Sequence, residues 1–116
     1  MLGNFLKYVG RDKATGFSVY GFSAGLALKD ALDDAVAKHG VNGITRSSLL
    51  AGLGTLTAFD AGGIIGKNNL AKKVSSACTM LEQFKNGRFV RVWPKKKGTF
   101  DCTPSNYIRL KEDLTG

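Results

Sequence analysis

The sequence predicts a small α+β fold, with helices in residues 1–66 and a β-hairpin followed by a closed tail in residues 67–116. Two observations favour this order. Apolar residues recur at helical spacing through the first region, and an Asn-Gly turn separates two strand-like runs in the second. The composition fits one folded unit, because 43% of the 116 residues are apolar and only two are prolines.

Two helices are predicted at the start of the chain. A short one runs from Leu2 to Val9 and ends at Gly10. A long one runs from Phe17 to His39 and ends at Gly40, a residue suited to the position after a helix. The apolar side of the long helix is expected to comprise Val19, Phe22, Leu28, Leu32, Ala35 and Val36.

The first half of the long helix is rich in small residues. Such residues let a second backbone come close, so we expect a tightly packed neighbour, most simply a sheet. The chain offers too few strands to build that sheet. The residues concerned are Gly21, Ala24, Gly25, Ala27 and Ala31.

A third helix is predicted from Arg46 to about Leu56. Thr45 is a suitable N-cap for it. A glycine-rich loop at residues 59–66 follows, and residues 67–76 are polar and are expected to be irregular.

The hairpin follows from Asn86-Gly87, a dipeptide that suits a type I′ turn. The flanking strands are predicted at residues 78–84 and 88–93. Pairing across the turn then sets the register, with cross-strand pairs each contributing about 0.2–1 kcal/mol. The expected pairs are Lys85 with Arg88, Phe84 with Phe89, Glu82 with Arg91, Met80 with Trp93 and, on the other face, Leu81 with Val92.

Both cysteines belong to this second region. A bridge between Cys78 and Cys102 would fold residues 98–102 back beside the hairpin, and closing a loop of that size contributes about 3–4 kcal/mol. The alternative is two buried free thiols. No metal site is expected, because zinc requires four closely spaced ligands and the only histidine is the distant His39.

The charge is unevenly distributed. The net charge is +8, and residues 67–116 hold eleven basic residues against four acidic ones. A basic half is typical of a solvated face, and also of proteins that bind nucleic acid or an anionic membrane. One hypothesis is therefore a small basic nucleic-acid-binding or interaction module that uses Arg88, Arg91, Trp93 and Lys95–Lys97.

No motif predicts an enzyme, and no cofactor is expected. Gly52-Leu53-Gly54 lies inside a helical pattern and lacks the third glycine of a dinucleotide-binding fingerprint. Asp33 and Asp34 are adjacent, so they point about 100° apart on a helix and are poorly placed for acid–base work.

The start of the chain does not resemble a signal peptide, and no apolar run is long enough to span a bilayer. A disulfide persists in oxidising compartments. The predicted disulfide therefore conflicts with the lack of a signal peptide at the start of the sequence. We expect the chain to be truncated, with Met1 not the natural start of the exported protein.

Five segments together resemble the C-terminal part of a known family, the type I, branched-chain amino-acid class of ABC-transporter solute-binding proteins, particularly its actinobacterial members. They are Tyr20 to Leu32, Ile44 to Leu50, Phe59 to Gly63, the Asn86-Gly87 hairpin and Gly98 to Cys102. Full members of the family belong to the α/β class and have two doubly wound lobes with the solute held in the cleft between them. The resemblance implies that residues 1–116 form the C-terminal segment of such a fold, with an incomplete site.

The resemblance also implies a function. Family members are exported or lipid-anchored, so the full-length protein is expected outside the cytoplasm, binding a small solute such as an amino acid and delivering it to an ABC permease rather than binding nucleic acid. In family members, aromatic residues lie at the cleft near the start of the helix that corresponds to the long predicted helix of this chain. This resemblance implies ligand contacts for Tyr20 and Phe17. Because this helix would lack its partner surface, copies of the chain are expected to associate through it.

Overall fold

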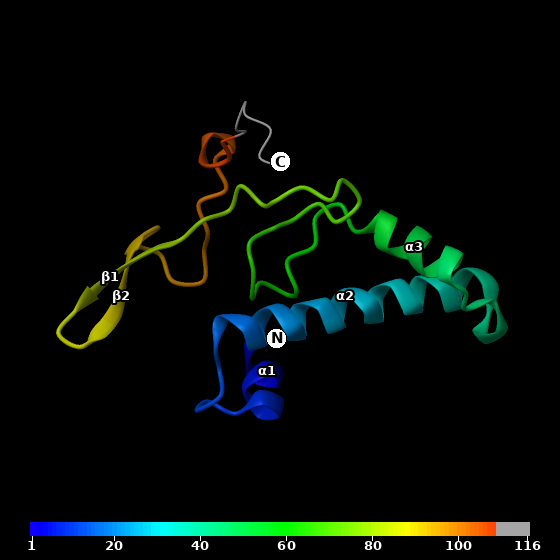
Figure 1. Ribbon diagram of the computed structural model, residues 1–116, viewed down its shortest axis with the longest axis horizontal. Coiled ribbons are helices and arrows are strands. Elements are labelled where there is room, and N and C mark those ends of the chain that lie inside the picture. Colours follow the sequence, from blue (N-terminus) through cyan, green and yellow to red (C-terminus); the bar gives the residue numbers. More distant parts are fainter. Residues whose placement is uncertain (109–116) are drawn as a thin grey trace, which may run out of the picture.

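The computed structural model describes residues 1–108. Within that range the chain has an α+β fold with three α-helices and one two-stranded antiparallel sheet. The hairpin and tail predicted for residues 67–116 are described only as far as residue 108. The helices are α1 (Leu2–Val9), α2 (Gly16–His39) and α3 (Arg46–Thr55), and the strands are β1 (Leu81–Lys85) and β2 (Arg88–Trp93). Figure 1 shows α3 beside the C-terminal end of α2, with the hairpin at the opposite end of the molecule.

Reciprocal hydrogen bonds cap both longer helices. At the start of α2, the Ser18 amide donates to Thr15 Oγ1 (3.2 Å) and the Thr15 amide donates to Ser18 Oγ (2.8 Å). Thr45 and Ser48 repeat this arrangement at α3. Each pair satisfies two backbone donors that a helix start leaves free. The Thr45 cap was predicted, whereas the serine at the third helical position was not recognised at either helix.

Helices α2 and α3 pack through small residues. Ala27, Ala31 and Ala35 are buried, and Gly52 of α3 approaches so closely that a Cβ there would lie 2.8 Å from the Ala31 carbonyl oxygen. The expected close neighbour therefore exists at Ala27 and Ala31, where it is a helix of the same chain rather than a sheet, but Gly21 and Gly25 have no neighbouring atom within 4 Å of where a Cβ would be. The predicted apolar side is wrong at Leu28 and Val36, which are 48% and 36% exposed, because backbone proximity buries the alanine side instead.

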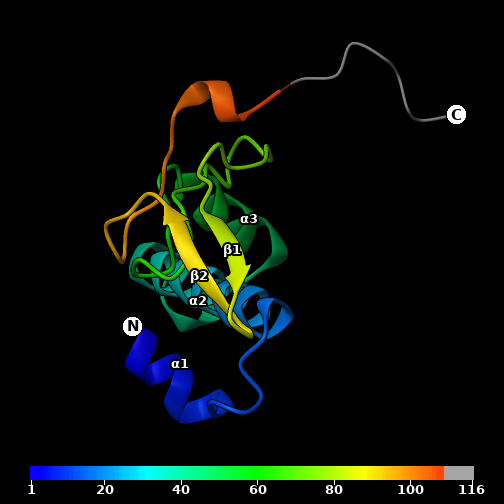
Figure 2. The same cartoon turned by 90° about the vertical axis from the view of Figure 1, so that its left-hand side faces the viewer.

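The N-terminal helix α1 contributes one large side chain. Phe5 is 2% exposed and packs edge-on against Phe22 of α2, with ring centroids 5.4 Å apart. Figure 2 shows α1 on the side of α2 that lies away from α3. Phe5 thus joins α1 to α2 through an aromatic pair.

The hairpin register is confirmed near the turn and wrong farther from it. Lys85 pairs with Arg88, Phe84 with Phe89 and Glu82 with Arg91, as predicted. Beyond them a bulge shifts the register, so that Trp93 pairs with Leu81 and not with Met80, and Leu81 does not pair with Val92. Val92 is the extra residue of the bulge, which no local sequence signal marks.

The tail is fastened to the hairpin in several ways. Cys78 and Cys102 form the predicted disulfide. Thr79 and Asp101 exchange two backbone hydrogen bonds of 2.8 and 3.0 Å. Regular pairing with β2 begins only at Leu81, so the strand predicted to start at Cys78 begins three residues later.

The chain as a whole exposes much more surface than a compact protein of its size. Its accessible surface is 9032 Å², whereas a compact monomer of 12.4 kDa exposes about 6100 Å². Its radius of gyration is 17.1 Å, against about 13 Å for a compact chain of this length. Three of the buried apolar side chains are alanines of α2, so the core is small.

Candidate functional site

A cavity of about 560 Å³ lies beside the first turns of α2. Its walls come from segments far apart in sequence: α2, the loop after α3, the segment before β1 and the tail. The volume lies within the range of small-molecule sites in proteins. The lining residues include Tyr20, Gly66, Asn68, Ser75, Ser76 and Cys78, together with an apolar set of Val19, Ile64, Ile65 and Phe100.

The two aromatic residues predicted as ligand contacts occupy different places. Tyr20 lines the cavity and still exposes 69% of its surface. Phe17 is 89% exposed and does not line the cavity. The start of α2 therefore presents Tyr20 at a cavity wall and Phe17 to the surroundings, and their contact with a ligand stays a prediction.

Asn68 is one of the lining residues and carries a buried side-chain oxygen. Its main chain is fixed by two hydrogen bonds with Phe59, of 2.8 and 2.9 Å. Its side-chain Oδ1 is buried and finds no hydrogen-bond donor among residues 1–108. Such an atom is costly to bury unless it is paired. Sequence reasoning missed Asn68, because no local pattern shows that the side-chain oxygen of an asparagine in a polar loop will be buried.

The disulfide forms part of the same wall. A Cβ on Gly66 would clash with Cys78 Cβ, so only glycine allows this approach. The Ser76 hydroxyl donates to the Lys67 carbonyl (2.7 Å) and accepts from the Cys78 amide (3.0 Å). These contacts hold the segment before β1 against the loop after α3.

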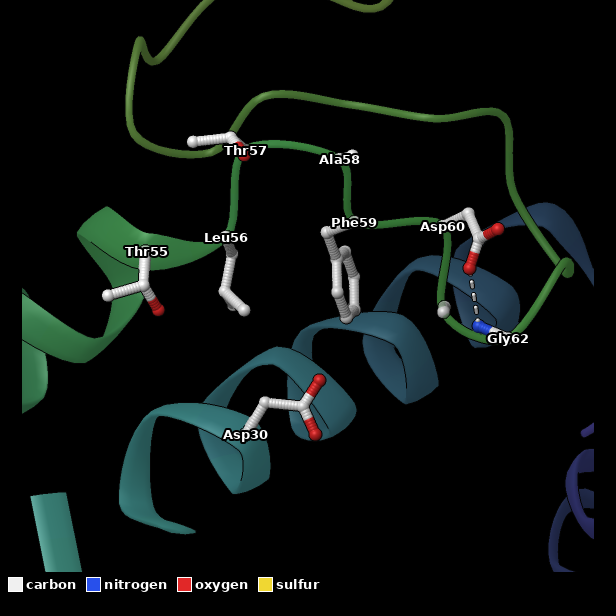
Figure 3. A pocket seen from close by; sticks show the side chains of 9 residues that line it. Asp30, Thr55, Leu56, Thr57, Ala58, Phe59, Asp60 and Gly62 are labelled. Atoms are coloured by element: carbon white, nitrogen blue, oxygen red, sulfur yellow. Dashed lines mark hydrogen bonds between the residues drawn. The ribbon is translucent and has the colours of Figure 1, made fainter. Parts of the chain in front are cut away.

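A second, more open cavity lies between α2 and the loop that follows α3, with a volume of about 410 Å³. Figure 3 shows Phe59 pointing from that loop toward α2, and the carboxylate of Asp30 on the helix below it. The Asp60 side chain is engaged locally, because Oδ1 accepts from the Gly62 amide at 2.9 Å. Asp30 is therefore the one lining carboxylate without such a bond to the loop.

The basic hairpin surface is partly occupied by the tail. Arg91 Nη1 donates to the Thr99 carbonyl at 2.8 Å, and Trp93 Nε1 donates to Asp101 Oδ2 at 2.9 Å. Hydrogen bonds from the Thr103 hydroxyl and the Trp93 indole lower the pKa of Asp101 to about 2. Two of the residues proposed for nucleic-acid binding are thus engaged by the tail, one of them next to a carboxylate.

Within residues 1–108, no group of three or more His, Cys, Asp or Glu side chains is arranged to hold a metal ion. No helix in the described part of the chain combines the length and apolar character that crossing a membrane requires. No protein-family model, curated protein or solved structure matches the chain.

Proposed function

We propose that this chain is the C-terminal part of an extracytoplasmic solute-binding protein that serves an ABC importer and binds a small solute, such as an amino acid. In this proposal the fold is part of a two-lobed type I binding-protein fold, and the solute lies in a cleft between this part and the rest of the protein. The role is binding without catalysis.

The observation that carries the proposal is the uncovered side of α2. Phe17 and Leu28 are 89% and 48% exposed. Gly21 and Gly25, which lie between them in the sequence, have no neighbouring atoms within 4 Å of where a Cβ would be. A helix side of this kind accommodates a closely packed partner, and α3 covers only the alanine side. The accessible surface exceeds that of a compact monomer by about 2900 Å². This excess agrees with a surface that other residues cover.

Two further features support the proposal. The Cys78–Cys102 disulfide suits an oxidising compartment outside the cytoplasm. Tyr20 lies at a cavity wall near the start of α2, which is where the resemblance to the family puts an aromatic ligand contact. An ABC permease is the partner that this role requires.

The size and location of the natural gene product test this proposal. Antibodies against this chain should detect, in the cell-envelope fraction of the source cells, a protein much larger than 12.4 kDa. Detection of a 12.4 kDa protein in the cytosolic fraction would contradict both the proposed class and the proposed location.

The same uncovered side of α2 should also drive association between copies of the isolated chain. Light scattering at increasing concentration should show a rise in mean mass, and replacing Phe17 and Leu28 together with serine should abolish the rise. A strict monomer at high concentration would show that this side of α2 does not need a partner.

A further inference from the structure

We propose that the tip of the hairpin is a docking surface for an anionic lipid bilayer, with Phe84 and Phe89 entering the headgroup region and Lys85 and Arg88 binding lipid phosphates. This surface is made by the ends of β1 and β2 next to the turn. It shares no residue with the uncovered side of α2 or with the cavity beside that helix, so the proposal does not rest on the proposed function.

The hairpin lies apart from the helices. Every residue of β1 and β2 except Arg91 is exposed, and no helix among residues 1–108 packs extensively against either strand. Figure 1 shows the turn between β1 and β2 projecting at one end of the molecule. A two-stranded hairpin is only marginally stable by itself, so its uncovered side chains are available to a partner.

The pairing at the turn divides the tip into an apolar face and a basic face. Phe84 pairs with Phe89, and Lys85 pairs with Arg88. Because neighbouring residues of a strand point to opposite faces, the two rings share one face and the two cations share the other. The rings pack edge to face and are 65% and 70% exposed. Amphipathic segments of this kind lie in the bilayer interface, with the apolar face buried and long basic side chains reaching the phosphates.

The charges around the tip favour an anionic partner. Residues 81–98 hold six basic side chains and one acidic side chain, that of Glu82, which lies opposite Arg91 in the pairing of the strands. Within residues 1–108 the two ion pairs are both in α2, so neither Lys85 nor Arg88 has a carboxylate partner there. An anionic bilayer supplies partners for both, at about a fivefold gain in affinity per basic residue.

A bilayer fits this tip better than a nucleic acid, which also presents phosphates. Bases stack on open ring faces, whereas Phe84 and Phe89 already pack against each other. The larger ring of Trp93 donates through Nε1 to Asp101 Oδ2, and that carboxylate would repel a nearby phosphate. Lipid can receive the pair of rings as a unit, without separating them.

Sedimentation with vesicles tests the proposal on the 116-residue chain. Vesicles of equal parts phosphatidylcholine and phosphatidylglycerol should bind it at least about tenfold more tightly than phosphatidylcholine alone. Lys85→Gln with Arg88→Gln should lower the affinity for the mixed vesicles about 25-fold. The matched control, Arg46→Gln with Lys72→Gln, removes the same charge at exposed positions outside the hairpin and should lower it about twofold or less.

Two changes of the ring pair separate insertion into lipid from stacking on bases. Phe84→Leu with Phe89→Leu keeps apolar side chains, whereas Phe84→Ser with Phe89→Ser removes them. The leucine variant should bind the mixed vesicles about tenfold more tightly than the serine variant, because lipid insertion depends on apolar surface. Stacking would need the rings themselves, so both variants would then lose binding equally.

Three results would overturn the proposal. Equal losses in the two glutamine variants would show attraction to the net charge of the whole chain and not to the tip. Equal binding of the leucine and serine variants would show that the rings do not enter lipid. Binding of a single-stranded oligothymidylate without binding of the mixed vesicles would assign the tip to a nucleic acid. The glutamine variants keep the test decisive even if the changes of the ring pair unfold the hairpin.

Discussion

The helical region and the hairpin region of this protein are held together in different ways. Helices α2 and α3 depend on backbone proximity at Ala31 and Gly52, with α1 attached mainly through Phe5. The hairpin and tail instead use a disulfide, a backbone bridge and hydrogen bonds from Arg91 and Trp93. The disulfide and the hydrogen bonds can hold the hairpin and tail together although this region has almost no core. The helices, by contrast, are not covered by a further layer of structure and depend on the few side chains that they bury.

Breaking the disulfide tests whether the two regions are independent and should have the largest effect. Replacing Cys78 and Cys102 with alanine should lower the free energy of opening the tail by about 3–4 kcal/mol. Hydrogen exchange at the Thr79 and Asp101 amides, which bond across the bridge, measures this directly. Far-ultraviolet circular dichroism should show unchanged helices, and a parallel loss of helical signal would contradict the independence of the regions.

Two glycines of the same helix test the close packing of the helical region. Gly52→Ala adds a Cβ that would lie 2.8 Å from the Ala31 carbonyl oxygen, so it should destabilise the chain by about 1–3 kcal/mol. Gly54→Ala is the matched control: a Cβ at this position has no neighbour within 4 Å, so it should be neutral or stabilise by up to about 1 kcal/mol. Thermal unfolding followed at the helical signal gives both values. Equal effects would show that the two helices do not approach so closely in solution.

The aromatic pair of the hairpin tests a weaker, exposed contact. Phe84 and Phe89 lie edge to face with centroids 5.3 Å apart, and both are more than half exposed. Phe84→Leu should destabilise the hairpin by about 0.5–1 kcal/mol, measured by hydrogen exchange of the Gln83 and Lys85 amides. Phe17→Leu, at an exposed position of α2, should leave these amides unchanged. An effect of similar size from both variants would point to a global change instead of a cross-strand contact.

The smallest expected effect is a pH dependence confined to the tail. Because the pKa of Asp101 is lowered from 3.8 to about 2, its hydrogen bonds stabilise the tail fully above pH 3.8, and this stabilisation is lost as the pH falls through about 2. Trp93 is the only tryptophan of the chain and bonds directly to Asp101. Its fluorescence should therefore change with a midpoint near pH 2, and Asp101→Asn should remove that transition. A midpoint near pH 4 would contradict the lowered pKa.

Features set by neighbouring residues could be predicted from the sequence. The Asn86-Gly87 turn fixes the pairing as far as Glu82 with Arg91, because turn geometry and side-chain pairs agree there. No local sequence signal marks the bulge at Val92, and the pairing of Thr79 with Asp101 depends on the returning tail. Those features could not be derived from the strand pattern alone.

The buried side of α2 and the cavity depend on contacts between distant segments. Leu28 was expected inside because it is large and apolar, but the approach of Gly52 buries the alanines on another side of the helix. A ligand contact for Tyr20 was predicted through the resemblance to a family, and it stays a prediction. The burial of Asn68 Oδ1 could not be predicted either, because no local pattern marks it.

The central claim is that this chain has an incomplete core and an α2 surface that other residues cover. Scanning calorimetry of the isolated chain at a concentration where it is monomeric measures the heat capacity change of unfolding, which scales with the apolar surface that folding buries. A compact chain of this length would give about 1.5 kcal/mol/K. We predict less than about half of that compact value, and a result near the compact value would show that the chain builds a complete core by itself.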